Sequence, residues 1–153
     1  MKTILFLLLA FTFFGCTGYE PLFSSKNLSF YIENIQNING DGITRKIANN
    51  LSGNKIKSDV KNNYTLKISS YLKDNITSKN SKGDAATYEL IISVEVKVYN
   101  GNSNYLIDTL NFNKKSNYNN RINKFDLSQY KKVIKEELIN KISEDIIIKL
   151  QSL

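Results

Sequence analysis

The chain has 153 residues, of which 41% are hydrophobic and 23% are charged. This composition is typical of a globular domain and excludes a disordered, collagen-like or many-span membrane chain. The net charge is +7, from 21 Lys and Arg against 14 Asp and Glu, but only Arg45 and Arg121 are arginines. Because the planar guanidinium of Arg is preferred for bidentate recognition of phosphates and bases, this charge is a weak indication of nucleic-acid binding. A coding bias toward Lys explains it equally well.

The residue types that are missing exclude several kinds of site. The chain has no His and a single Cys, Cys16. It therefore cannot form a His-based catalytic triad, a His/Cys zinc site, a CxxC redox pair or an internal disulfide. The seven glycines match neither GxxxxGK[ST] nor GxGxxG, the spacings of known nucleotide-binding loops. We expect no cofactor and no bound metal.

Carboxylates and tyrosines are the remaining candidates for acid–base catalysis. Glu89 and Glu95 lie on one predicted strand, about 20 Å apart at roughly 3.3 Å per residue, which is too far for paired action on a glycoside. Asp41 and Asp84 stand beside glycines in predicted turns, where Asp commonly supports backbone geometry. Gly40-Asp41-Gly42 lacks the further acidic positions of a calcium loop. We expect no catalytic residue and no enzymatic activity.

The start of the chain predicts an export signal followed by a lipid anchor. Residues 1–15 combine Lys2, an apolar run over residues 4–14 and the small residue Gly15 directly before Cys16, as in bacterial signal peptides. The run is too short to span a membrane, which takes about 20 apolar residues. The position of Cys16 resembles the lipobox of bacterial lipoproteins, in which cleavage precedes an acylated Cys, although the usual Leu three positions earlier is missing.

A mature chain that begins at Cys16 is anchored by its acyl chains, which contribute about 0.8 kcal/mol for each buried CH₂ group. Residues 16–27 then form a lipidated tether, and residues 28–153 form a single periplasmic domain. Thr17 follows the Cys in place of the Asp that retains many lipoproteins at the inner membrane. The resemblance therefore implies transfer to the outer membrane.

The first part of the domain predicts a strand and a short helix. The strand is expected over residues 28–35, where β-branched and aromatic residues gather. The helix is expected to end near Gly53, because Ile43, Ile47 and Leu51 are four residues apart and share one side of a helix.

Three strands are expected next. The second strand covers residues 64–72 and the third covers residues 86–98, where apolar side chains occupy every second position. Such alternation gives one packed face and one wet face, as in an antiparallel sheet. Asn100-Gly101-Asn102 predicts a hairpin turn into a fourth strand over residues 105–113. Residues 114–124 are predicted to form a polar loop.

A long helix is expected from Leu127 to Leu150, with Asp126 as its N-cap and Gln129 in a capping box. Its apolar stripe comprises Tyr130, Ile134, Leu138, Ile142, Ile146 and Leu150, broadened by Leu127, Val133, Ile139 and Ile147. The order predicts an α+β fold, a two-layer sandwich in which a four-stranded mixed or antiparallel sheet carries two helices on one face (βαβββα). The first βαβ unit is expected to be a right-handed crossover.

Several segments together resemble the LPS-assembly lipoprotein family, LptE, in its alphaproteobacterial branch. The start Gly15-Cys16-Thr17-Gly18-Tyr19-Glu20-Pro21-Leu22-Phe23 is similar to that branch's GCGFxPLY start, with Thr17 as one extra residue. The segment from Ala86 to Val98 resembles the family's long central strand. Ser116-Asn-Tyr-Asn119 and the terminal helix resemble its C-terminal third.

The resemblance implies a lipid-anchored protein on the periplasmic face of the outer membrane. It also implies partnership with the β-barrel LptD, as a plug and assembly factor for lipopolysaccharide insertion into the outer leaflet. Because exposed Lys and Arg suit the phosphates of lipopolysaccharide, Lys114, Lys115, Arg121 and Lys124 in the predicted loop are candidates for contact with lipopolysaccharide or the barrel. An alternative is an outer-membrane lipoprotein of similar fold that acts in phospholipid transport or cell-wall synthase activation. No nucleic-acid partner is expected at this location.

Overall fold

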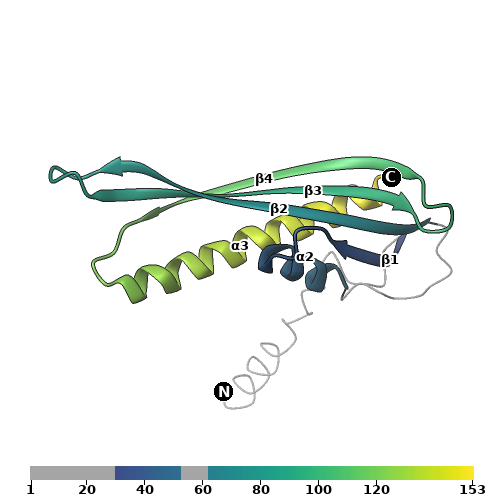
Figure 1. The fold of residues 1–153 in the computed structure, drawn as a ribbon, viewed down its shortest axis with the longest axis horizontal. Coiled ribbons are helices and arrows are strands. Elements are labelled where there is room, and N and C mark those ends of the chain that lie inside the picture. The colour runs from purple at the N-terminus through teal and green to yellow at the C-terminus, as the bar shows by residue number, and fades with distance from the viewer. Residues whose placement is uncertain (1–29, 53–61) are drawn as a thin grey trace, which may run out of the picture.

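The computed structural model describes residues 30–52 and 62–153. The predicted signal peptide, Cys16 and the tether lie outside the described residues. The elements are β1 (Phe30–Asn37), α2 (Gly42–Ser52), β2 (Asn62–Lys79), β3 (Ala85–Asn100), β4 (Leu106–Asn119) and α3 (Lys124–Gln151). Figure 1 shows a long, narrow sandwich with both helices on the same face of the sheet. The predicted α+β sandwich is therefore confirmed.

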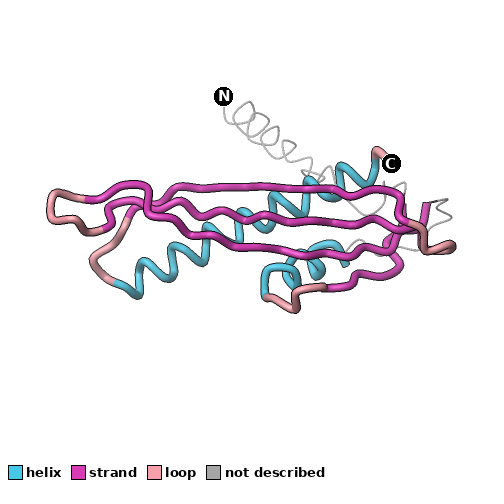
Figure 2. Tube along the Cα trace, turned by 45° about the horizontal axis from the view of Figure 1, so that its top comes forward, coloured by secondary structure: helices cyan, strands magenta, loops and turns pink. Residues whose placement is uncertain are grey.

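The four strands form one mixed sheet in the order β1-β2-β3-β4. β1 runs parallel to β2, with Phe30 opposite Asn62 and Asn37 opposite Ile68, whereas β2, β3 and β4 pair antiparallel along most of their lengths. β1 and α2 thus lie beside only one half of the long strands, which we call the proximal half (Figure 2). The distal half contains the β2–β3 hairpin and the start of α3.

The core lies between the sheet and the helices. Its fully buried members from the strands and helices include Leu66, Ile68, Leu90, Ile92, Val96, Ile47, Leu51, Ile142 and Ile146. These positions confirm the period of two in the second and third predicted strands and the spacing of four in both predicted helices. Among the described helices, none combines the length and the apolar composition needed to cross a membrane.

Asp41 fixes the start of α2 and joins it to β2. One carboxylate oxygen accepts the N–H of Thr44 at 2.7 Å, as an N-cap does. The other accepts the Ser70 hydroxyl at 2.7 Å, and the Asn39 amide donates to the Ser70 carbonyl at 2.7 Å. Burial alone raises the pKa of Asp41, but the hydrogen bonds from Thr44 and Ser70 outweigh it and lower the pKa below its ordinary value. The predicted backbone role of Asp41 is confirmed.

The β3–β4 turn lies where Asn100-Gly101-Asn102 predicted it, but its geometry differs from a two-residue turn. The left-handed residue is Asn104, with φ of 53°, and its N–H donates to the Asn100 carbonyl at 2.9 Å. Gly101 lies close to two neighbouring side chains, because an added Cβ would lie 2.6 Å from Glu33 Oε2 and 2.7 Å from Asn63 Cγ, and these side-chain ends would have to move. The turn therefore packs closely against the β1 and β2 strands.

Two strand predictions, for β2 and β4, were wrong in extent. β2 continues to Lys79, and Leu72, expected in the packed face, is 36% exposed because β1 and α2 do not reach it. β4 continues to Asn119, so residues 114–119 form a strand and not a loop. Polar residues on both faces of residues 114–119 hide the alternation of apolar and polar side chains. Pairing with β3 and the burial of Tyr118 nevertheless hold this segment in the sheet.

The long helix begins three residues earlier than predicted. Its N-cap is Asn123, whose side chain accepts the N–H of Phe125, whereas Asp126 lies within the first turn. Val133, predicted to broaden the apolar stripe, is 61% exposed. The helix contacts α2 at Glu136, where Lys46 Nζ lies 2.6 Å from the Glu136 carboxylate. The predicted stripe is therefore buried chiefly in the proximal half.

Candidate functional site

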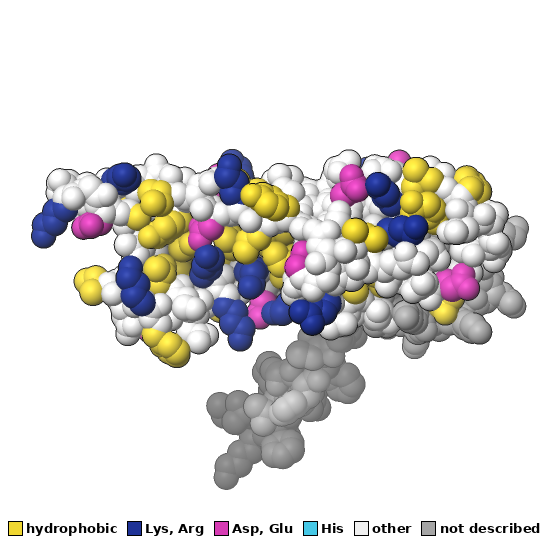
Figure 3. Space-filling view, in the orientation of Figure 1, with side chains coloured by type: hydrophobic (Ala, Val, Ile, Leu, Met, Phe, Trp, Pro, Cys, Tyr) yellow, Lys and Arg dark blue, Asp and Glu magenta, His cyan; other side chains and the backbone are white. Residues whose placement is uncertain are grey.

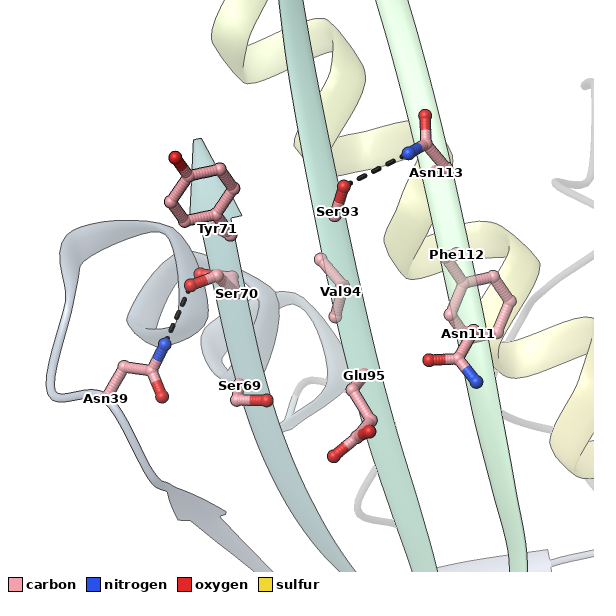
Figure 4. A pocket seen from close by; sticks show the side chains of 10 residues that line it. All are labelled: Asn39, Ser69, Ser70, Tyr71, Ser93, Val94, Glu95, Asn111, Phe112 and Asn113. Atoms are coloured by element: carbon pink, nitrogen blue, oxygen red, sulfur yellow. Dashed lines mark hydrogen bonds between the residues drawn. The ribbon is translucent and has the colours of Figure 1, made fainter. Parts of the chain in front are cut away.

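The sheet face opposite the helices is polar and carries a shallow hollow. Strand side chains alternate between the two faces, so the odd-numbered residues of β2, β3 and β4 project outward. The hollow has a volume of about 480 Å³, and its outward-facing lining comprises Ser69, Tyr71, Ser93, Glu95, Asn111 and Asn113 (Figure 4). The Asn113 amide donates to the Ser93 hydroxyl at 3.0 Å. This face therefore exposes hydroxyl, amide and carboxylate groups that can hydrogen-bond to water or to a polar surface.

The distal half holds a cluster of three aromatic rings, which we call the tyrosine cluster. Tyr118 of β4 is buried and stacks on Tyr88 of β3, with ring centroids 5.1 Å apart and planes 15° apart. Tyr130 of α3 meets Tyr118 edge-on at 6.4 Å and 81°. Offset and edge-on pairs of this kind are the favoured aromatic geometries. The cluster ties α3 to β3 and β4.

Asp74 supplies the polar partner of this cluster from β2. The Tyr118 hydroxyl lies 2.9 and 2.8 Å from the two Asp74 carboxylate oxygens, and Lys131 Nζ of α3 lies 2.5 Å from one of them. Burial, with the hydrogen bond to Asp74 and its negative charge, raises the pKa of Tyr118 above its ordinary value. The phenol therefore remains protonated and donates to Asp74.

The four predicted basic candidates do not form one loop cluster. Lys114 and Lys115 are neighbours on β4 and so point to opposite faces of the sheet. Lys114 Nζ lies 2.7 Å from Asp145 of α3, and Lys115 Nζ lies 3.1 Å from Glu89 of β3. The expectation of one basic loop was wrong because the backbone here is a strand.

Arg121 and Lys124 do lie together at the distal end. Both line a hollow of about 550 Å³, to which the β2–β3 hairpin contributes Asn80 and Asp84. The Arg121 guanidinium carbon lies 4.3 Å from the centroid of the Tyr130 ring, in cation–π contact. Exposed apolar side chains flank the two cations: Ile122 is 104% exposed and Phe125 is 68% exposed. This end combines positive charge with exposed apolar surface.

The other carboxylates considered for catalysis are separated on the outer face. Glu89 is paired with Lys115, and Glu95 lies 3.5 Å from Lys97. Within residues 30–52 and 62–153, no three His, Cys, Asp or Glu side chains form a group that could hold a metal ion. The Asp74–Tyr118–Lys131 contact was missed by sequence reasoning because its members are 44 and 57 residues apart.

Comparison with known proteins gives one family and a set of similar folds. A family model described as LptE, Lipopolysaccharide-assembly, matches residues 28–150. Rare lipoprotein B from Shewanella oneidensis has a TM-score of 0.63 and 18% identity, covering 80% of this chain and 94% of that one. Uncharacterized lipoprotein B from Nitrosomonas europaea has a TM-score of 0.61 and 12% identity, covering 88% and 91%.

A putative lipoprotein from Caulobacter crescentus has a TM-score of 0.56 and 12% identity, covering 77% of this chain and 88% of that one. At these identities the likeness shows a shared fold. No curated protein sequence matches the chain.

Proposed function

We propose that this chain, which belongs to the LptE family of lipopolysaccharide-assembly proteins, is an outer-membrane lipoprotein that partners the β-barrel LptD. In this role it acts as plug and assembly factor while lipopolysaccharide is inserted into the outer leaflet. The family match over residues 28–150 carries the proposal. The lipoprotein names of three structures with the same fold support an anchored envelope protein.

The shape and surface of the domain suit a plug. The sandwich is long and narrow, and its three long strands are paired along most of their lengths (Figure 1). The hollow on its outer face is lined by Ser, Asn and Glu side chains together with Tyr71 (Figure 4). The inner wall of a membrane barrel is polar and water-lined, so a rigid domain with this outer face fits such a lumen.

The distal end is our proposed contact for lipopolysaccharide or the barrel. Arg121 and Lys124 line one hollow beside exposed Ile122 and Phe125. Cations beside apolar side chains complement a molecule in which phosphates adjoin acyl chains. Lys114 and Lys115 remain candidates, but each must first leave its carboxylate partner. The double variant Arg121→Ala/Lys124→Ala should reduce lipopolysaccharide binding more than Lys149→Ala, an exposed lysine at the far end of α3.

The lipid anchor is proposed at Cys16, with the tether over residues 16–27. Mass spectrometry of the mature protein should find acyl chains on Cys16 and no residues before it. Cys16→Ala should prevent acylation and cleavage before residue 16, and should remove the protein from the outer-membrane fraction. An unmodified Cys16 in the wild-type protein would contradict the anchor.

The partnership is tested by depletion and by capture. Depleting the protein should block maturation of LptD and reduce lipopolysaccharide in the outer leaflet. The tagged protein, purified from detergent-solubilised membranes, should bring LptD with it. Recovery of a phospholipid transporter or a cell-wall synthase instead, with normal LptD maturation after depletion, would contradict the proposal and favour the alternative function.

A further inference from the structure

The distal half of β2 forms an open edge of the sheet. β1 pairs with β2 only as far as Ile68, whose carbonyl accepts the N–H of Ile38 at 2.9 Å. The next carbonyl on that side, at Ser70, is bonded by the Asn39 amide at 2.7 Å. Among the residues that the structure describes, no strand pairs with β2 on this side beyond that point. We call residues 71–77 the open edge.

The backbone groups of the open edge can be assigned by alternation. Successive residues of a strand direct their N–H and C=O groups to opposite sides. Because the carbonyls of Ile68 and Ser70 point toward β1, the backbone groups of Leu72, Asp74 and Ile76 point to the same side. Leu72, Asp74 and Ile76 lie opposite β3 residues in the register, but their backbone N–H and C=O groups point away from β3. These groups are therefore available to pair with another strand.

Apolar side chains of the open edge are also uncovered. Leu72 and Ile76 belong to the helix-facing side of β2, on which Leu66 and Ile68 are fully buried. Leu72 is nevertheless 36% exposed and Ile76 is 53% exposed. β1 and α2 lie beside only the proximal half (Figure 2), so neither of these two elements covers Leu72 and Ile76.

Basic side chains lie near the open edge, beside the ion pair of Asp74 and Lys131. Lys73 projects from the outer face, and Lys132 and Lys135 lie on α3, within one turn of Lys131, which binds Asp74. Within the described part of the chain, none of these three lysines has a carboxylate partner within ion-pair distance. Figure 3 shows basic side chains beside apolar ones between the sheet and the helix. The edge therefore favours an occupant of negative charge.

We propose that an extended, acidic segment of a partner protein adds to the sheet as a strand along residues 71–77. Only an extended polypeptide supplies alternating carbonyl and amide groups at the spacing of a strand. Its helix-facing apolar side chains cover Leu72 and Ile76, and its outward acidic side chains lie near Lys73. The inference is independent of the partnership with LptD, because it specifies the chemistry of the strand and not the protein that supplies it.

Other occupants fit the open edge less well. A second copy paired through the same edge would bring Lys73 and the α3 lysines close to their own counterparts, and like charges across an interface are unfavourable. A lipid would cover Leu72 and Ile76 but could not satisfy the alternating backbone groups. β4, the other edge of the sheet, has its helix-facing Leu110 and Phe112 packed against the core. Its exposed apolar side chain, Leu106 at 48%, lies at the start of the strand, in the proximal half.

The proposal is tested by hydrogen exchange on the full chain, purified from membranes in detergent. The probe is an end-blocked octapeptide of alternating Val and Glu, and the control peptide replaces Glu by Lys. The acidic peptide should slow exchange of the Leu72, Asp74 and Ile76 amides by about tenfold or more at saturation, and the basic peptide should not. Unchanged exchange at these amides, or slowing only in β4, would overturn the proposal.

Two further results decide between occupants. Protection of the three amides without any peptide would overturn the proposal. Protection that is independent of protein concentration would indicate another segment of this chain as the occupant, and protection that rises with protein concentration would indicate a second copy. Charge reversal in Lys73→Glu should weaken binding of the acidic peptide about tenfold or more. Lys149→Glu, at the opposite end of α3, is the matched control and should have little effect.

The natural occupant is identified by photocrosslinking in the native envelope. A photoreactive residue at Asn75, which projects from the outer face of the open edge, should form an adduct with an acidic segment of another protein. The same residue at Asn113, on the outer face of β4, should not form that adduct. An adduct at Asn75 with lipid or with a second copy of this chain, or no adduct, would overturn the proposal.

Discussion

The proximal and distal halves of the sandwich differ in what fills the space between the sheet and α3. In the proximal half, the facing side chains are aliphatic and fully buried, as in Leu66, Ile142 and Ile146. In the distal half, Tyr118 packs in the tyrosine cluster and its hydroxyl binds Asp74. The helix-facing side of β2 is buried in the first region and exposed in the second.

This difference separates two kinds of stabilisation. Aliphatic packing depends on the amount of surface removed from water and tolerates changes of similar volume. The distal contacts depend on particular donors and acceptors, because the Asp74 carboxylate is satisfied by Tyr118 and Lys131. We therefore expect the proximal half to set the stability of the fold and the distal half to set the position of its basic end.

The largest expected effect is a truncation in the proximal half. Leu66 is fully buried, so Leu66→Ala should lower the free energy of unfolding by about 2–5 kcal/mol through lost burial and a residual cavity. Leu72→Ala is the matched control, because Leu72 lies on the same face of β2 and is 36% exposed. It should cost about 1 kcal/mol or less. Denaturant unfolding measures both, and equal losses would show that the two halves are packed alike.

The second prediction concerns the hydroxyl of Tyr118. Tyr118→Phe keeps the stacked ring but removes the donor to Asp74, and hydrogen bonds to charged groups contribute about 1.5–3 kcal/mol. We expect the lower end, about 1.5 kcal/mol, because Lys131 still binds the carboxylate. Tyr130→Phe is the control, since its hydroxyl has no hydrogen bond among the described residues, and should change stability by less than about 0.5 kcal/mol. Equal effects would contradict the role of Asp74.

The proximal half was largely predictable from the sequence, because its pattern follows from burial. The alternation in β3 and the four-residue spacing of Ile134, Leu138, Ile142 and Ile146 record which side chains face the core. The N-cap was wrong because Asn123 and Asp126 are both good caps, and the choice depends on where β4 ends. Leu72 and Val133 were assigned to the core because periodicity does not reveal how far a covering element extends.

The distal site could not be read from the sequence for a different reason. Residues 114–119 are polar at most positions, so neither face gives an apolar pattern. Their strand conformation depends on pairing with β3, where Tyr88 lies opposite Tyr118. The contacts among Asp74, Tyr118 and Lys131 join three elements and leave no local spacing to detect. Only the two-residue period of Leu110 and Phe112, continued to Tyr118, would have indicated that Tyr118 is buried.

The third prediction tests the hydrogen bonds that Asp41 accepts from Thr44 and Ser70 in the proximal half. Removing this N-cap in Asp41→Ala should cost about 1 kcal/mol at pH 7. The folded-state pKa of Asp41 lies below its ordinary value of 3.8, so its contribution is complete above that pH. It is lost as the pH falls through the lowered folded-state pKa.

The measurement is the difference in unfolding free energy between wild type and variant at pH 7 and near pH 3. The difference should shrink at the lower pH. Asp41→Asn keeps an acceptor for the Thr44 N–H and should be less damaging than Asp41→Ala at pH 7. A difference that stays constant or grows toward pH 3 would contradict the lowered pKa.

The smallest expected effect is at Lys114, where the two halves meet opposite Ile92. Lys114 and Asp145 side chains are 36% and 37% exposed, so Lys114→Ala should lower the free energy of unfolding by only about 0.5 kcal/mol. A double-mutant cycle with Asp145→Asn should give a coupling that fades toward 1 M salt, where the screening length is about 3 Å. A coupling as large as the Tyr118→Phe effect would place this pair among the distal contacts. A small coupling leaves Lys114 able to exchange Asp145 for a phosphate oxygen at little cost, as a contact with lipopolysaccharide requires.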